Sequence, residues 1–373
     1  MKILHVAEGA RFAGIESHLM AMFGELAGRE DTSAELAVFH AGPLAQRAAA
    51  LGVPVHMIER RGKYDRRAAR RLAACIADGG AQIVHTHGYL ANVVADHAAS
   101  RHNAPLVTTV HGAAEPFGGF AGLKMRLNLA LDQRVMRRRC ARVIAVAEHL
   151  KNRLVADGVP GDKIAVVYNG IAAAGEATLD GDEARRRWNL TPDEQVISFV
   201  GRLEPVKDPL LFVAFAREVV RDVPRAVFLV AGDGPLEEET RRAVAEARLA
   251  DRFRFLGFVD DLEPVFAATD LYVLTSRHEG IPNAALEAMR VQVPVLAPAV
   301  GGLPELLAGL DGALADGRTA SELASRAVEF LVDPGRRALA GQAARERFLA
   351  QFTAATMVQN TRRLYLDVLG GKS

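Results

Sequence analysis

The sequence predicts an α/β protein built from two doubly wound domains, each with a parallel β-sheet between layers of helices. Short β-branched runs alternate with helix-length segments along the chain, and several of these runs are apolar on both faces, as buried strands must be. The length of 373 residues is enough for two domains. In such sheets ligands bind at the carboxyl ends of the strands, so motifs at strand ends carry the most weight.

Seven strands are expected in the first half of the chain and five in the second. They are residues 3–8, 35–40, 55–59, 82–87, 106–111, 143–148 and 164–169, and then 196–201, 226–232, 253–257, 271–276 and 293–298. Residues 172–188 interrupt this rhythm with a small, acidic, glycine-containing stretch that is typical of a linker. We therefore expect one domain over 1–172 and a second over 173–352, followed by a helix over 353–373.

Composition excludes several classes of protein. Half of the residues are apolar and about a quarter are charged, as in ordinary globular proteins. The apolar run after Met1 is too short for a signal peptide, and no segment offers about 18 uninterrupted apolar residues. The two cysteines give neither a disulfide framework nor a zinc site. A cytoplasmic protein is expected.

Charge is distributed unevenly along the chain. Residues 1–172 hold 22 Lys and Arg against 15 Asp and Glu, whereas the remainder holds 24 against 30. The basic excess lies in two Arg-rich segments, 59–71 and 124–142, and the second has Leu127, Leu131 and Val135 at a spacing of four. A basic amphipathic helix suits an anionic membrane surface. A solvated helix face above core leucines explains the pattern equally well. Nucleic acid is not expected, since aromatic interleaving and a recognised module are missing.

The strongest motif is residues 276–289, directly after an expected strand. Glu279 precedes a helix start at Gly280–Asn283, and Glu287 follows two turns later. Exposed backbone N–H groups at a helix start bind phosphate, and the two carboxylates can accept hydrogen bonds from sugar hydroxyls and a ribose diol. Two solvated surface charges are the alternative, but Glu287 lies among Ala, Leu and Met.

A second motif, residues 198–209, ends a strand at Gly201 and continues with Arg202 and Lys207. A guanidinium fork and a compact ammonium group together suit a diphosphate, and they would stabilise the charge that a leaving diphosphate gains. The phosphate loop of ATP-binding kinases is not matched.

The first strand leads into Gly14 and Glu16 at a helix start, without the GxGxxG pattern of dinucleotide dehydrogenases. Histidines end two later strands: His85 and His87, then His111. A metal is not expected there, since the sequence offers no carboxylate or cysteine set to complete a site. His111 is better placed to hydrogen-bond a sugar.

Eight motifs in order resemble the retaining glycosyltransferases of the GT-B fold, in the family numbered four. They are residues 13–16, 109–112, 168–171, 200–208, 230–236, 256–261, 279–289 and 300–306. The resemblance implies two Rossmann-like domains that face a central cleft, with the acceptor on the first and the nucleotide sugar on the second. It also implies that the last helix crosses back to the first domain.

The resemblance also implies roles for individual residues. The groups expected at the reacting centre are His111, Glu279, Arg202 and Lys207. The donor-binding residues are Gly14, Gly201, Arg202, Lys207, Phe258, Val259, Glu279, Gly280, Ile281, Pro282, Asn283 and Glu287. The acceptor-side residues are Glu16, His87 and Tyr89. Such enzymes use no metal or other cofactor, and retention is explained by attack from the leaving-group face.

The implied reaction moves a hexose-type sugar from a nucleotide diphosphate sugar to a lipid-linked or glycan acceptor, in surface polysaccharide or glycolipid assembly. A UDP-sugar is favoured and GDP-mannose is next. The sequence departs from the family at Gln82, Ala147 and Ala172, and at Ala13, where a second glycine is usual. The alternatives are a GT-B sugar-nucleotide epimerase, a phosphorylase and a non-catalytic glycan- or nucleotide-binding protein on the same scaffold. The four charged groups Arg202, Lys207, Glu279 and Glu287 argue against the binding protein.

Overall fold

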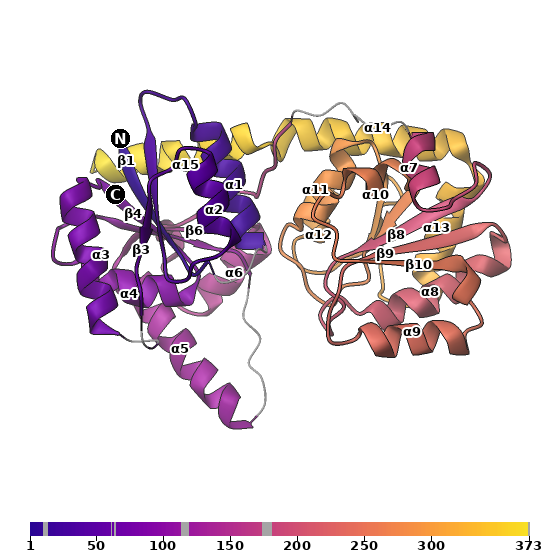
Figure 1. The fold of residues 1–373 in the computed structure, drawn as a ribbon, viewed down its shortest axis with the longest axis horizontal. Coiled ribbons are helices and arrows are strands. Elements are labelled where there is room, and N and C mark those ends of the chain that lie inside the picture. Colours follow the sequence, from indigo (N-terminus) through magenta and orange to yellow (C-terminus); the bar gives the residue numbers. More distant parts are fainter. Residues whose placement is uncertain (10–13, 61, 63–64, 113–118, 174–180, 372–373) are drawn as a thin grey trace. The chain divides into compact units, whose positions relative to one another are not determined.

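The computed structural model describes the chain except residues 10–13, 61, 63–64, 113–118, 174–180 and 372–373, and it leaves the side chains of 119–125 undescribed. Ala13 therefore lies outside the described residues. The chain divides into two compact units. Unit 1 is Met1–Gly170 together with Ala354–Ser373, and unit 2 is Ile171–Thr353. Each unit holds one parallel sheet with helices on both faces (Figure 1).

The sheet of unit 1 has seven parallel strands in the order β3-β2-β1-β4-β5-β6-β7. Its strands are β1 (Lys2–Ala7), β2 (Ser33–Val38), β3 (Val55–Met57), β4 (Ile83–His87), β5 (Leu106–Val110), β6 (Cys140–Ala145) and β7 (Ile164–Val166). Its helices are α1 (Gly14–Leu26), α2 (Pro43–Ala50), α3 (Arg66–Gly79), α4 (Tyr89–Ala99), α5 (Gly119–Arg138), α6 (Glu148–Ala156), the 3-10 turn η1 (Gly161–Lys163) and α15 (Ala354–Leu369).

The sheet of unit 2 has six parallel strands in the order β10-β9-β8-β11-β12-β13. Its strands are β8 (Gln195–Val200), β9 (Ala226–Ala231), β10 (Phe253–Gly257), β11 (Leu271–Val273), β12 (Val295–Pro298) and β13 (Leu314–Ala315). Its helices are α7 (Gly181–Arg187), α8 (Pro209–Asp222), α9 (Glu237–Glu246), the 3-10 turn η2 (Ala250–Arg252), α10 (Glu263–Ala267), α11 (Asn283–Arg290), α12 (Leu303–Leu306), α13 (Ala320–Val332) and α14 (Pro334–Gln351).

The two-sided apolar pattern of the strands explains the layers. Adjacent residues of a strand point to opposite faces, and in β1 both Ile3 and Leu4 are fully buried. Leu4 belongs to the core beneath α3 and α4, while Ile3 belongs to a second core beneath α1 and α15. In unit 2, Val196 and Ile197 divide between two cores in the same way. The predicted α/β class with parallel sheets is therefore confirmed.

All twelve expected strands are present, and β13 is the strand that the sequence did not predict. It comprises Leu314 and Ala315 alone, which is too short for a recognisable pattern. Both cysteines are free, and Cys140 is buried. Across the part of the chain that the structure covers, each helix is too short or too polar to cross a bilayer.

Candidate functional site

The strongest sequence motif forms a loop that we call the glutamate loop, residues 276–283, between β11 and α11 of unit 2. Glu279 is buried, and its Oε1 accepts hydrogen bonds from Lys207 Nζ at 2.6 Å and from Ser276 Oγ at 2.5 Å. Helix α11 follows Pro282 without a side-chain cap, so its first backbone N–H groups remain for a ligand. The structure thus joins two of the predicted residues, Lys207 and Glu279, beside a helix start.

Two glycines hold the glutamate loop in place. Gly301 has φ +57°, and a Cβ there would lie 2.0 Å from the carbonyl oxygen of Glu279. A Cβ on Gly302 would lie 2.4 Å from the carbonyl oxygen of Gly280, and the Gly302 N–H donates to Glu279 O at 3.0 Å. These glycines belong to one of the eight motifs, but the sequence did not indicate their role. The feature that could have revealed it is a pair of adjacent glycines shortly after a strand.

The predicted phosphate-binding cations lie on the loop between β8 and α8. Gly201 has φ +154° and Arg202 is half exposed, with its guanidinium 3.4 Å from Glu204 Oε2 and 3.7 Å from Asp233 Oδ1. Arg202 therefore lies beside the two carboxylates just named, whereas Lys207 contacts Glu279. A surface pair of this length is weak, so the guanidinium is free to turn towards an anion.

Asp208 anchors this loop, which sequence reasoning missed. It is buried with φ +50°, and its carboxylate lies 2.5 Å from Arg318 and 3.1 Å from Arg277. It also caps α8 by accepting from Leu211 N at 3.3 Å. Because Asp208 follows Lys207 directly, these bonds fix the backbone from which the lysine reaches Glu279. The signal in the sequence is an N-cap aspartate followed by proline.

Glu287 and Phe258 differ sharply in exposure. Glu287 is half-buried on α11, and burial raises its pKa from 4.5 to about 7, with Asp261 adding to the rise and Arg290 opposing it. Phe258 follows β10 and is 67% exposed, while Val259 packs against the core beside it. An exposed aromatic ring at a strand end offers a face for a flat ligand.

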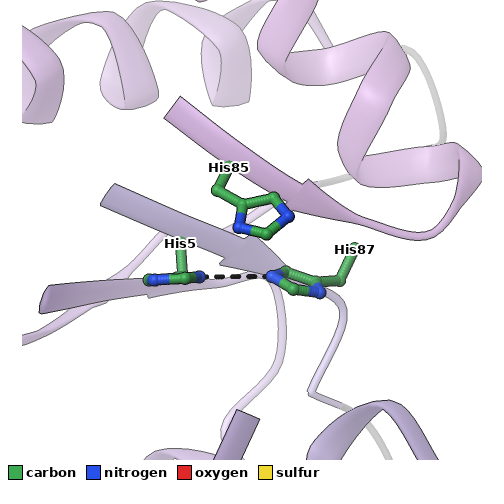
Figure 2. A group of neighbouring side chains, drawn as sticks. All are labelled: His5, His85 and His87. Carbon is green, nitrogen blue, oxygen red and sulfur yellow. Dashed lines mark hydrogen bonds between the residues drawn. The ribbon is translucent and has the colours of Figure 1, made fainter. Parts of the chain in front are cut away.

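Five histidines come together in unit 1. His5 lies on β1, His85 and His87 on β4, His111 directly after β5, and His18 on α1. The β1–β4 register pairs His5 with His85, and Figure 2 shows how the rings of His5 and His87 meet beside His85. His5 Nδ1 lies 3.2 Å from His87 Nε2, and His87 Nδ1 lies 3.2 Å from His111 Nε2.

These histidines are neutral. Burial lowers the pKa of His5 to about 3 and of His18 to about 4, and it holds the pKa values of His85, His87 and His111 well below the ordinary 6.5. Each neutral ring carries one proton, so each can donate through one nitrogen only. His5, His87 and His111 therefore form a chain in which all bonds run in one direction, and the tautomer of His111 depends on that of His5.

The remaining predicted residues of unit 1 lie around this cluster. Gly14 begins α1 and is exposed, and Glu16 is buried in the first turn of that helix. Tyr89 begins α4 and packs against the core. The turn before it meets α1, since a Cβ on Gly88 would lie 3.8 Å from Ile15. The acceptor-side prediction of Glu16, His87 and Tyr89 thus concerns residues on three neighbouring elements of unit 1.

Comparisons with known proteins agree with this architecture. A model described as Glycosyltransferase Family 4 matches residues 5–174, and one described as Glycosyl transferases group 1 matches residues 194–333. A D-inositol 3-phosphate glycosyltransferase of Actinosynnema mirum is 31% identical over 92% of this chain and 77% of its own length. An N-acetyl-alpha-D-glucosaminyl L-malate synthase of Bacillus anthracis is 26% identical over 82% of this chain and 80% of its own length.

Solved structures share the fold. HepE of Anabaena, crystallised with UDP, has a TM-score of 0.85 at 21% identity and covers 98% of this chain and 99% of its own. The glycosyltransferase WaaG, involved in lipopolysaccharide biosynthesis, has a TM-score of 0.75 at 12% identity and covers each chain completely. From its two matched family models, its relatives and its two parallel-sheet units, the chain belongs to glycosyltransferase family 4, the glycosyl transferases group 1, and is an enzyme of the GT-B fold.

Proposed function

We propose that the enzyme is a retaining hexosyltransferase that uses a nucleotide diphosphate sugar, with a UDP-sugar as donor and GDP-mannose as the next candidate. The observation that carries this proposal is the contact of Lys207 with Glu279 beside the start of α11. The lysine and Arg202 bind the diphosphate, and the helix start caps it. Glu279 accepts sugar hydroxyls. HepE binds UDP and UDP-glucose, which supports a uridine donor.

The proposed chemistry uses the residues of the chain alone, without a metal or other cofactor. As the bond to the sugar breaks, negative charge grows on the leaving diphosphate, and Arg202 and Lys207 stabilise that charge more in the transition state than in the ground state. The acceptor attacks from the leaving-group face, so a diphosphate oxygen takes the acceptor's proton and the anomeric configuration is retained. Glu287 binds the ribose diol, and His111 contacts the donor sugar.

Nucleotide release from a panel of UDP-, GDP- and ADP-sugars, with chelator present, tests the donor site. We expect slow hydrolysis of one donor, reduced by at least 100-fold in Arg202→Ala and in Glu279→Ala. Arg217→Ala is the matched control, since Arg217 is exposed on α8 and the change removes an equal charge from the same unit. Equal rates in Arg202→Ala and Arg217→Ala would refute the assignment of Arg202.

For the acceptor, we propose a lipid-linked or glycan molecule with negative charge, as in surface polysaccharide or glycolipid assembly. A pocket beside the end of β5 is lined by Arg126 and Arg153 and also by Asp132 and Asp157. Arg153 lies 3.5 Å from Asp157, so Arg126 is the cation that an anionic acceptor would meet. Two relatives are named for small anionic molecules, L-malate and inositol 3-phosphate, which supports an acceptor with negative charge. Anomeric proton coupling in the product, measured by NMR, tests retention.

Membrane contact is proposed for the two Arg-rich segments, 59–71 and 124–142. Along α5 the exposure falls from Leu127, which is 61% exposed, through Leu131 to buried Val135, so among these three residues only Leu127 offers an apolar surface. On α3 the arginines are exposed above buried Ala68 and Leu72, as on a solvated face. Arg61, Lys63 and Tyr64 of the 59–71 segment lie outside the described residues.

Sedimentation with anionic vesicles, which stand in for the cytoplasmic surface of a membrane, tests this contact. We expect the protein to bind anionic vesicles at low salt, to be released from them at high salt, and not to bind neutral vesicles. Leu127→Ser reduces the bound fraction if the helix inserts. The absence of binding at low salt would remove the membrane from the proposal and leave the donor chemistry untouched.

A further inference from the structure

The histidine cluster of unit 1 contains two overlapping sets that bring ligand nitrogens together. One set is His5, His85 and His87, and the other is His18, His87 and His111. In each set the three nitrogens lie within 4.8 Å of one another. The function proposed above needs His87 and His111 only as hydrogen-bonding groups, so the convergence of five neutral imidazoles has no explanation in it.

His18 supplies a free ligand nitrogen to the second set. Its Nδ1 lies 3.0 Å from the amide oxygen of Asn169, which cannot donate, so the ring proton is on Nδ1. Nε2 therefore carries a bare lone pair, and among the described residues it is buried without a hydrogen-bond partner, as is Nε2 of His5 in the first set. An unpaired buried acceptor is unfavourable. A histidine whose other nitrogen donates to an oxygen is the arrangement found at metal ligands, where the second bond fixes the tautomer.

The first set is less suited to bind a metal ion, because both ring nitrogens of His85 already form hydrogen bonds. Its Nδ1 lies 2.5 Å from the Tyr365 hydroxyl and its Nε2 lies 2.8 Å from Thr109 Oγ1. A metal bound to His85 would break one of these buried bonds. In the second set, the only bond lost is the one between His87 and His111.

Both sets contain a pair of ring nitrogens 3.2 Å apart, His5 with His87 in the first and His87 with His111 in the second, so the hydrogen bonds of His85 decide between them. His87 Nδ1 and His111 Nε2 are 3.2 Å apart, close to the separation of about 3.3 Å between two ligands of a tetrahedral zinc with Zn–N bonds of about 2.0 Å. We propose that His18, His87 and His111 form a three-histidine site for one divalent transition metal ion of the zinc class. Half-buried His111 opens the site to solvent and leaves the fourth position to water.

The protons can be placed without adding or losing one. Binding needs a lone pair on His87 Nδ1 and on His111 Nε2, so His87 carries its proton on Nε2 and His111 on Nδ1. His87 Nε2 then donates to His5 Nδ1, 3.2 Å away, which makes His5 the residue that fixes the tautomer of a ligand. Three imidazoles without a carboxylate select zinc, copper or nickel over magnesium and calcium.

Occupancy of this site would withdraw His87 and His111 from substrate. The metal is therefore an inhibitor in this proposal and no part of the transfer chemistry. Its binding is measurable without donor or acceptor, so the two proposals fail separately: a donor that is not hydrolysed says nothing about the metal, and the reverse holds too.

The test is calorimetric titration of ZnCl2 into chelator-treated, tag-free enzyme, with Co²⁺ as a spectroscopic probe. We expect one equivalent to bind and the visible bands of four-coordinate Co²⁺ to appear. His18→Ala should weaken binding at least 100-fold, and His5→Ala about 10- to 100-fold as the loss of a supporting residue. His102→Ala is the control, since His102 is exposed outside the cluster, and it should leave affinity unchanged.

Two results would overturn the proposal. One is Zn²⁺ binding that His18→Ala leaves unchanged while His85→Ala abolishes it, which assigns the metal to the other set. The second is absorption spectroscopy at the zinc edge of the wild-type protein that shows fewer than three imidazole ligands. This measurement stays decisive if His18→Ala fails to fold, and His18→Gln gives a second variant of similar size.

Discussion

Replacing Glu287 by Gln tests whether a half-buried carboxylate on α11 weakens the fold at neutral pH. Burial is the largest cause that raises its pKa from 4.5 to about 7. The folded protein therefore keeps a proton on Glu287 at pH values where the unfolded chain has lost it. The free energy of unfolding must then fall as pH rises from 4.5 towards 7, and it levels off above that range.

The size of the effect follows from the two pKa values. A tenfold change in an equilibrium constant corresponds to about 1.4 kcal/mol, so a pKa of about 7 in place of 4.5 corresponds to about 3 kcal/mol. Gln resembles the protonated acid in shape and cannot ionise. The Glu287→Gln variant should lose this pH dependence and exceed the wild type in stability above pH 7 by up to about 3 kcal/mol.

Urea unfolding followed by tryptophan fluorescence measures this. The chain has one tryptophan, Trp188, which packs against a core of the same unit as Glu287. Glu246→Gln, an exposed change on α9, is the control and should keep the wild-type pH profile. The reasoning is refuted if the wild type and Glu287→Gln show the same slope between pH 5 and pH 7. Above pH 7, where Glu287 is ionised, the variant should also bind nucleotide about 10-fold more weakly, since a charged hydrogen bond to the ribose is lost.

Three further predictions concern the loops and the core. Gly301→Ala places a Cβ 2.0 Å from a carbonyl oxygen of the glutamate loop, so it should destabilise unit 2 in urea by more than Gly309→Ala, whose φ is also positive but whose Cβ meets nothing within 4 Å. Asp132→Asn should remove a fall in stability between pH 4 and pH 6, measured by circular dichroism, because burial raises the Asp132 pKa from 3.8 to about 6. Tyr365→Phe leaves His85 Nδ1 without its partner and should cost about 1–3 kcal/mol in thermal unfolding; an unchanged midpoint would contradict that bond.

The fold could be predicted because the sequence of each strand indicates by itself that the strand is buried. A strand covered on both faces is apolar at successive positions, as at Ile3 and Leu4, and that signal needs no knowledge of its neighbours. The glutamate loop could be predicted for a similar reason, because its carboxylates and helix start are contiguous. Its contact with Lys207 comes from 72 residues away, and the sequence did not predict it.

The histidine cluster could be predicted only in part. His85 and His87 are neighbours in sequence, but His5 joins them because β1 lies beside β4 in the sheet. Strand order depends on the whole unit, so the sequence around residue 5 does not indicate that β1 lies beside β4. His18 looks like one polar residue on an amphipathic helix until α1 is packed on the sheet. A metal is not expected from the sequence because no carboxylate or cysteine set completes a site, and the sequence does not place His5 or His18 beside the later histidines.

The path of the chain has a consequence for biosynthesis. Unit 2 is one continuous stretch, whereas unit 1 is completed by α15, whose Met357, Leu364 and Tyr365 fill a core together with Ile3. Beside that helix, Ile171 N donates to Phe352 O at 3.2 Å, so the outgoing and returning segments are tied together. A ribosome releases α15 only after all of unit 2. Unit 1, although most of it is translated first, must therefore wait for unit 2 to be translated before its second core can be completed.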